Sequence, residues 1–420
     1  MMSDYRFPAP TLLAMAITGF LSMAFSTTGS AQSLGDAVLG GRPLADLRFR
    51  FEHIDQAGFA RDAEALTLRA RLGYETLAYE GFSALAEIEA VTALGPRRFD
   101  DGASRPTGFP VVPDADTVEL NQGFLTYQGL EDATFRIGRQ RIALDNQRFI
   151  GNVGFRQNEQ TFDAVTIHST ALDDATIDYG FISNVKRVFG EDAAQGDLQT
   201  RTHYLNVGYG GLDWAQFNAY AYLIDIDEIP TLSSQTTGGR MAGAYAFRFN
   251  RDLRLLYAAE FAWQRDYADN PADYGLPYVL IEPGLAYGDL SARLGYEVLA
   301  GNGTSSVQTP LGTLHAFQGA TDKFVVTPPD GIRDLYLDFV YRGEETDGPF
   351  SDIEAQATVH SFRSEESDTR FGREWYARIT KSFRQTLGGT VSLSAEYAFY
   401  DAESFSTDTH QLWLTANFRL

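Results

Sequence analysis

The sequence predicts an all-β protein, a transmembrane antiparallel β-barrel of about 18 strands. Three observations predict this fold. Residues 1–31 have the pattern of an export signal. The rest of the chain contains about 18 segments in which apolar and polar residues alternate, separated by turns rich in Gly, Asp, Asn and Pro, without a helical stretch between them. The last of these segments runs to the final residue.

Composition narrows the class of protein. The chain has 420 residues, with 34 Lys and Arg against 56 Asp and Glu and a net charge of −22, so we expect no nucleic-acid partner. It has no cysteine, which excludes disulfides, thiolate nucleophiles and Cys-ligated metals. A mean hydropathy of −0.23 excludes a polytopic helical membrane protein but allows a barrel, in which every second strand residue faces water.

The N-terminus predicts a signal peptide over residues 1–31. Arg6 precedes an apolar run over residues 11–25, and the small residues Gly29 and Ala31 precede the expected cleavage site. The alternative is an N-terminal membrane anchor. The run is short for a bilayer core about 30 Å thick, so we expect cleavage.

Residues 32–420 are predicted to form one outer-membrane β-barrel. The alternation is clearest in eight segments, at residues 47–51, 66–74, 82–90, 255–263, 290–298, 335–341, 353–359 and 391–399. Strands of a soluble β-sandwich are typically about five or six residues long. Several of these segments approach the roughly nine to eleven residues that a tilted strand needs to cross a bilayer.

The C-terminal segment favours a closed barrel in the outer membrane. Leu412, Leu414, Ala416, Phe418 and Leu420 form one apolar face, as in the terminal strand of outer-membrane barrels, although a terminal Phe is more common there than Leu. A lipid-facing sheet must close on itself, because unpaired backbone groups are costly in hydrocarbon. Aromatic residues cluster near strand ends, which suits the membrane interface but also reflects ordinary β-propensity.

A barrel of this size leaves an aqueous channel, so function depends on the residues that line it. Of the 34 basic residues only 3 are Lys and 34 − 3 = 31 are Arg, whose planar fork binds carboxylates through two hydrogen bonds. Arg48, Arg50, Arg69 and Arg71 lie on the polar faces of two adjacent predicted strands. They form either a ladder that passes an anion between weak sites or a network neutralised by nearby glutamates.

The densest polar stretch runs from Phe135 to Asp163. We expect a strand, a tight turn and a second strand to hold its side chains against the lumen wall; the alternative is a long exterior loop with ordinary salt bridges. The candidate pore-lining residues of this stretch are Arg136, Arg139, Arg141, Asp145, Asn146, Arg148, Arg156 and Asp163.

Three blocks of sequence resemble a known family. They are GRQRIALDNQRFIGNVGFRQNEQTFDAV at 138–165, EFAWQRDYADNPADY at 260–274 and TPLGTLHAFQGATDKF at 309–324, and they are similar to recurring blocks of the alginate export family of outer-membrane proteins. The resemblance runs from about Leu47 to Tyr341 and more weakly to the C-terminus. It implies an 18-stranded barrel in the Gram-negative outer membrane, whose best-known members pass the polyuronate alginate outward through a constricted, arginine-rich pore.

The resemblance also implies a constriction. The positions that it assigns there are Arg139, Arg141, Asp145, Asn146, Arg148 and Asp163. It does not carry over the substrate: passage of another carboxylated solute, in either direction, is equally compatible with the residues.

Residues 308–324 do not alternate and are rich in Phe and Leu, which predicts an ordered loop. We expect it to fold into or across the pore with Lys323 as a lining residue; the alternative is packing against the outer rim.

No pattern for catalysis emerges. The histidines show no HExxH spacing, and there is no GxSxG elbow. We therefore expect a non-enzymatic, cofactor-free, monomeric porin that works by diffusion, with outer-membrane lipid, lipopolysaccharide and an anionic carbohydrate or carboxylated solute as partners. The alternatives are an outer-membrane β-barrel hydrolase and a secreted β-rich carbohydrate-binding protein.

Overall fold

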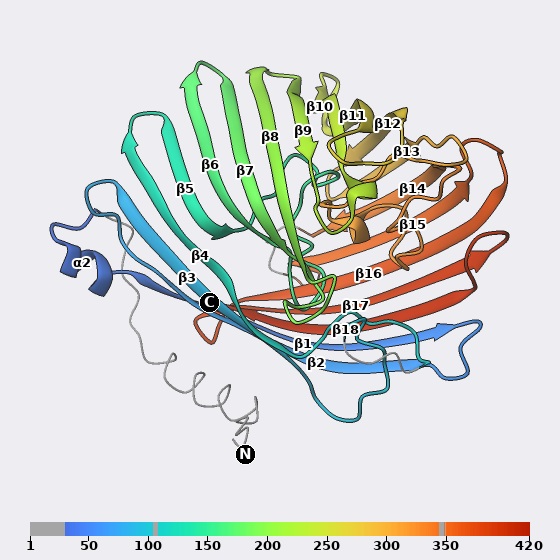
Figure 1. Ribbon diagram of the computed structural model, residues 1–420, viewed down its shortest axis with the longest axis horizontal. Coiled ribbons are helices and arrows are strands. Elements are labelled where there is room, and N and C mark those ends of the chain that lie inside the picture. The colour runs from blue at the N-terminus through green and yellow to red at the C-terminus, as the bar shows by residue number, and fades with distance from the viewer. Residues whose placement is uncertain (1–29, 104–107, 344–347, 349) are drawn as a thin grey trace.

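The computed structural model describes residues 30–103, 108–343, 348 and 350–420, which form a closed antiparallel barrel of 18 strands (Figure 1). Each strand pairs with its neighbour in sequence, and β18 pairs with β1 from Asp46↔Arg419 to Gln56↔Thr409. The predicted fold class and strand number are confirmed. Nearly all of the expected signal peptide, residues 1–29, lies outside the described residues.

The strands cover most of the described chain. In order they are β1 (Arg42–Gln56), β2 (Ala63–Glu75), β3 (Phe82–Ala93), β4 (Thr117–Leu130), β5 (Ala133–Gln140), β6 (Thr161–Leu172), β7 (Ala175–Lys186), β8 (Asp197–Leu212), β9 (Ala215–Ile224), β10 (Ser234–Phe247), β11 (Asn250–Asp266), β12 (Gly275–Tyr287), β13 (Leu290–Leu299), β14 (Ile332–Arg342), β15 (Ile353–Arg363), β16 (Arg370–Thr386), β17 (Gly389–Ala402) and β18 (Thr409–Arg419).

Helical structure in the described residues is limited to short pieces. They are α2 (Leu34–Leu39), η1 (Pro230–Leu232) and η2 (Leu314–Ala316). Ser33 caps α2 by accepting a hydrogen bond from the Asp36 N–H. No helix of the described chain is long and apolar enough to span a bilayer.

The two ends of the barrel differ in their connections. At one end, where β1 begins and β18 finishes, most connections are tight turns, such as the two residues between β4 and β5. At the other end lie the long connections, of which residues 94–116, 141–160 and 300–331 are the longest. We call these the short-turn end and the long-loop end.

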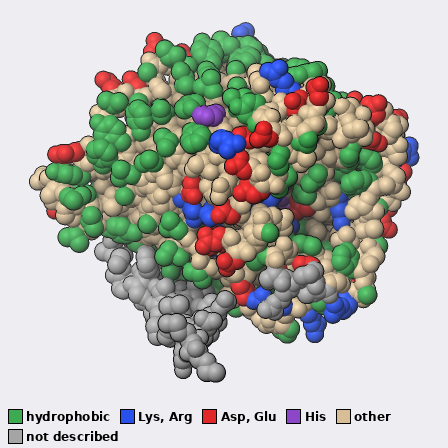
Figure 2. Space-filling model, in the orientation of Figure 1, with side chains coloured by type: hydrophobic (Ala, Val, Ile, Leu, Met, Phe, Trp, Pro, Cys, Tyr) green, Lys and Arg blue, Asp and Glu red, His purple; other side chains and the backbone are tan. Residues whose placement is uncertain are grey.

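The two faces of the wall follow the predicted alternation. On β1, Phe49 points outward and is 47% exposed, whereas Arg50 points into the lumen and is 3% exposed. Large apolar side chains remain exposed on the outside of nearly every strand, as expected for a surface that contacts lipid. In Figure 2 hydrophobic side chains gather around β5 to β7, and charged side chains gather in the middle of the view, where the long loops lie.

Two long loops fold into the lumen and join each other. The first, residues 141–160, receives hydrogen bonds from the lumen face of β1, and the second, residues 300–331, receives one from Gln264 of β11 to the Gln308 carbonyl at 2.8 Å. A parallel β-bridge connects Ile150 to Leu311, where the Gly151 N–H donates to the Leu311 carbonyl at 2.9 Å.

The expectation of a tight turn within residues 135–163 is wrong. β5 ends at Gln140 and β6 begins at Thr161, and the segment between them is neither a tight turn nor an exterior loop. It crosses the lumen because its Arg, Asn and Gln side chains find their partners on the opposite loop and on the inner wall. The expected inward folding of residues 308–324 is what the structure shows.

An added positive charge should lower the free energy of unfolding more on the outward face of the wall than on its lumen face. Val359→Arg places a cation on the outward face near the middle of β15 and should destabilise the barrel by about 2–4 kcal/mol. Gln356→Arg, on the lumen face of the same strand beside Asp338, should cost less than about 1 kcal/mol. Urea unfolding in lipid vesicles measures both, and equal costs would contradict the assignment of faces.

Candidate functional site

The two inward loops are locked together by a buried ion pair. Arg156 of the first loop contacts Asp322 of the second at 2.8 Å and Glu52 of β1 at 3.3 Å. His315 also contacts Asp322, at 3.0 Å, and stacks on the Phe155 ring with 3.5 Å between ring centroids. Burial favours the protonated form of Asp322, but the charges and hydrogen bonds of His315 and Arg156 outweigh it and lower its pKa to about 2.

A second set of pairs attaches the first loop to β2 and β3. Arg141 contacts Glu87 at 2.8 Å and donates a hydrogen bond to Glu159 at 2.6 Å. Arg71 pairs with Glu89 and reaches Glu159 at 3.5 Å. Burial opposes ionisation of Glu159, yet Arg71 and Arg141 outweigh it and lower its pKa. These arginines are therefore neutralised by acidic neighbours.

The remaining loop candidates also hold the loop in place. Arg148 contacts Glu297 of β13 at 3.0 Å and donates to Gln318 at 2.8 Å. Asp145 accepts a hydrogen bond from Asn206 of β8 at 2.6 Å, and burial raises its pKa. The Asn146 side chain accepts from the Arg148 N–H at 3.2 Å, which is a local turn contact.

Arg48 and Arg50 differ from the arginines that hold the inward loops in place. Among the described residues neither has a carboxylate within ion-pair distance. Arg48 donates to Asn417 and to backbone carbonyls of the first loop, and Arg50 donates to the Phe155 carbonyl at 2.7 Å and to Thr415 at 3.3 Å. These acceptors are neutral, so neither guanidinium on the lumen side of β1 is paired with a carboxylate among the described residues.

The neighbouring strand extends this basic region. Arg69 of β2 lies directly opposite Arg48 in the register of the two strands. It pairs with Asp46, but its Nε and Nη1 atoms have no hydrogen-bond partner although the side chain is fully buried. We call Arg48, Arg50 and Arg69 the basic wall.

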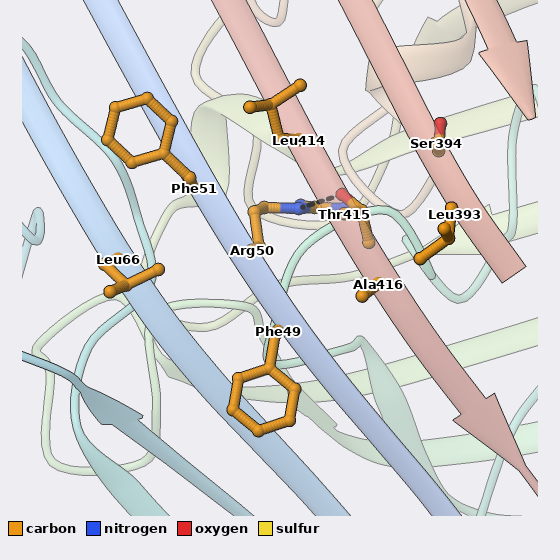
Figure 3. Close-up of a pocket in the computed structure, with 9 residues that line it drawn as sticks. All are labelled: Phe49, Arg50, Phe51, Leu66, Leu393, Ser394, Leu414, Thr415 and Ala416. Carbon is orange, nitrogen blue, oxygen red and sulfur yellow. Dashed lines mark hydrogen bonds between the residues drawn. The ribbon is translucent and has the colours of Figure 1, made fainter. Parts of the chain in front are cut away.

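Figure 3 shows the barrel wall at this point. The Arg50 side chain extends from β1 to Thr415 of β18, its direct partner in the register, whereas Phe49 and Phe51 lie on the outward side. These residues, with Leu66 and Leu414 among others, line a shallow groove of about 320 Å³ in the wall. The guanidinium of Arg50 therefore belongs to the lumen, although its backbone borders the lipid-facing surface.

Arg139 and Asp163 do not lie in the lumen. They are direct partners in the β5–β6 register and form an ion pair at 2.8 Å. Ile137 lies two residues before Arg139 on β5, and Val165 lies two residues after Asp163 on β6. Both side chains face outward, with exposed fractions of 56% and 44%. Because side chains alternate along a strand, Arg139 and Asp163 share that outward face. The resemblance identified these residues without fixing the side of the wall on which they lie.

Two further predicted lining residues have no anionic partner within the part of the chain that the structure describes. Arg136 faces the lumen and lies over the Phe124 ring at 4.6 Å. Lys323 is half-buried in the second loop and, among the described residues, has no hydrogen bond or ion pair. Burial lowers its pKa to about 8, against the opposing charges of Glu374 and Asp322.

Two acidic residues that contact the second inward loop were not among the residues predicted from the sequence. Glu297 and Glu374 face the lumen on β13 and β16 and both contact the second loop. Alternation with outward residues such as Tyr296 and Trp375 indicates that both glutamates face the lumen. Alternation alone does not predict which loop they contact. No group of three or more described His, Asp or Glu side chains is arranged to hold a metal ion.

Comparisons with known proteins agree with this architecture. A family model described as "Alginate export" matches residues 45–276. The fold is similar to Acinetobacter baumannii OccAB4, with a TM-score of 0.73 and 13% identity over 90% of this chain and 97% of that one. It is similar to Pseudomonas aeruginosa OpdO, with a TM-score of 0.70 and 13% identity over 92% and 98%.

A third structure was determined with a carboxylate solute present. It is Pseudomonas aeruginosa OpdK with vanillate, which is similar with a TM-score of 0.65 and 12% identity over 90% of this chain and 98% of that one. No curated protein sequence matches the chain significantly.

The positions of Arg156 and Arg139 predict different costs for losing each arginine. Arg156→Met leaves Glu52 buried without its cation and Asp322 with His315 alone, and it should lower the free energy of unfolding by about 3–5 kcal/mol. Arg139→Met breaks a partly exposed outward pair and should cost less than about 1 kcal/mol. Urea unfolding gives both values, and limited proteolysis should cut the inward loops only in the Arg156 variant. Similar values would contradict the placement of the two residues.

Proposed function

The chain belongs to the alginate export family of Gram-negative outer-membrane β-barrel proteins, and from this premise we propose that it is a passive channel for anionic, carboxylated solutes. An alginate-like polysaccharide is one candidate solute. In outer-membrane barrels the short turns face the periplasm and the long loops face outward, so the inward loops enter from the extracellular side.

The observation that carries this proposal is the unneutralised charge of Arg48 and Arg50. Both face the lumen beside the first loop and bond only to neutral acceptors. Arginine in this state is matched to a carboxylate, which accepts two parallel hydrogen bonds from its fork. Ion pairs elsewhere in the lumen hold the loops, and Arg48 and Arg50 of the basic wall are left for a solute.

The whole-chain charge of −22 does not oppose this proposal. At physiological ionic strength charges act over about 8–10 Å, so a solute in the lumen responds to the groups that line its path. Selectivity then depends on a few arginines and on Lys323, which lies on the second loop without a partner among the described residues.

The carboxylate class is broader than alginate. The similar structure of OpdK contains vanillate, an aromatic carboxylate, and the basic wall has the same chemistry to offer to either kind of acid. The direction of passage follows the solute gradient, because diffusion through a pore has no inherent direction.

The alternatives from the sequence find less support. A secreted carbohydrate-binding protein would not expose a continuous outward belt of large apolar side chains. A barrel hydrolase needs a nucleophile beside a histidine, but His360 faces the lumen and bonds Asp334, whereas Ser361, the next residue of β15, faces the other side of the wall.

Removing the basic wall should reduce anion selectivity. In planar bilayers under a salt gradient, the reversal potential of the wild type should indicate preference for anions at low salt, fading as salt rises. Arg48→Ser with Arg50→Ser should reduce this preference and weaken block by oligouronates. Arg139→Ser, on the outer wall, is the matched control and should leave both unchanged. A wild-type pore that prefers cations would overturn the proposal.

Lys323 predicts a pH dependence. Its pKa of about 8 means that the side chain is cationic below this pH and neutral above it. Anion selectivity should therefore decline between about pH 7 and about pH 9. Lys323→Arg keeps its charge over this range and should abolish the decline. A decline that persists in this variant would remove Lys323 from the conduction path.

A further inference from the structure

The lumen wall presents a carboxylate that the second inward loop surrounds with donors. Glu374 of β16 is fully buried and accepts hydrogen bonds from the Ala320 N–H, from the Thr321 N–H at 3.2 Å and from the Thr321 hydroxyl. Among the described residues no Lys or Arg pairs with it. The hydrogen bonds that it accepts all come from the loop, as in sites where proteins bind external anions, and the charge of His360, its partner in the β15–β16 register, also acts on it.

The backbone of this segment has an unusual shape. Gln318, Gly319 and Asp322 have φ values of +50°, +87° and +57°. In this turn the successive N–H groups of Ala320 and Thr321 converge on one carboxylate, an arrangement that is called a nest. A Cβ atom at Gly319 would lie 2.5 Å from a Glu374 oxygen, so the close approach of the carboxylate requires glycine there. We use the name nest for residues 318–322.

The nest lies beside additional cationic groups. Lys323 follows it directly, and its pKa responds to the charge of Glu374 although no ion pair joins the two. Asp322, the last residue of the nest, is bound by Arg156 of the first loop at 2.8 Å. A solute carboxylate in the nest would therefore bind the backbone N–H groups and could also pair with the ammonium group of Lys323. Glu374 binds the N–H groups but forms no ion pair with Lys323.

We propose that the nest is a carboxylate-binding site that Glu374 occupies when no solute is present. A solute carboxylate that takes the place of Glu374 would release residues 318–322 from β16 and widen the lumen. Glu374 would thus hold the second loop closed until the channel meets the class of solute that it passes. This inference rests on the proposed function in one respect, that the solute carries a carboxylate.

Competition between Glu374 and the solute carboxylate sets the solute concentration at which the second loop is released. Glu374 is tethered to the wall, so its effective concentration at the nest is in the millimolar range or above. A simple carboxylate should act only at millimolar concentrations or above. A solute that also uses Lys323 gains differential affinity for the released state and should act at lower concentrations.

Single-channel recording tests the proposal. We would compare acetate with chloride at equal ionic strength. In the wild type acetate should raise the population of the wider state by about fivefold or more. Glu374→Gln cannot be held in the nest in the same way, so it should show the wider state without acetate and respond no further. Glu396→Gln is the matched control, because Glu396 faces the lumen on β17 and, within the described part of the chain, accepts hydrogen bonds only from Tyr376 and Ser394 of the wall.

A crosslink provides a second, independent variant. Ala320 of the nest and Ala398 of β17 belong to one small buried cluster with Trp413, and the chain has no natural cysteine. Ala320→Cys with Ala398→Cys, once oxidised, should lock the loop to the wall and abolish the acetate response, which reduction should restore.

Three results would overturn the nest proposal. They are a wild type that does not respond to acetate, a Glu374→Gln variant that behaves as the wild type, and an acetate response that survives oxidation of the double-cysteine variant. Reversal potentials from the same membranes separate this failure from failure of the proposed function. An anion-selective pore without an acetate response refutes the nest alone, whereas a cation-selective pore refutes the channel proposal itself.

Discussion

Closure of the sheet is the constraint on which the rest of the structure depends. In hydrocarbon no water is available to pair a free backbone N–H or carbonyl, so β1 must pair with β18 along its length. Once the sheet is closed, every strand has one side toward lipid and one toward the lumen. Charged residues of the wall are then gathered in a narrow interior, where Arg and carboxylate side chains must either pair or face solute.

Pairing consumes most of this interior charge. Arg141, Arg148 and Arg156 neutralise wall carboxylates and so fix the two inward loops across the pore. Among the described residues, Arg48, Arg50 and Glu374 are exceptions to this pairing. Arg48 and Arg50 donate to neutral oxygens, and Glu374 accepts hydrogen bonds from the backbone of the second loop. In both places a carboxylate solute would change the interactions, because it would pair with Arg48 and Arg50 and would compete with Glu374 for the nest.

Local pattern predicted the wall well but not the lumen. The outward position of Phe49 and the inward position of Arg50 follow from a period of two, which needs no knowledge of distant residues. Arg156 and Asp322 are 166 residues apart and meet only after two loops fold inward, which no local pattern encodes. The same limit explains why the sequence of residues 135–163 predicts two strands joined by a tight turn, whereas the structure has a long inward loop between them. Arg139 was assigned to the constriction by resemblance, which carries residue identity but not the face of the strand.

The central claim is that a solute carboxylate binds at the basic wall. The most direct measurement is a crystal structure of the protein soaked with a brominated carboxylate and recorded at the bromine absorption edge. The account predicts an anomalous peak in the lumen beside Arg48 and Arg50, with the carboxylate of the ligand toward their guanidinium groups. Bromine bound only on the outer wall, for instance beside Arg139, or a lumen without any peak, would contradict it.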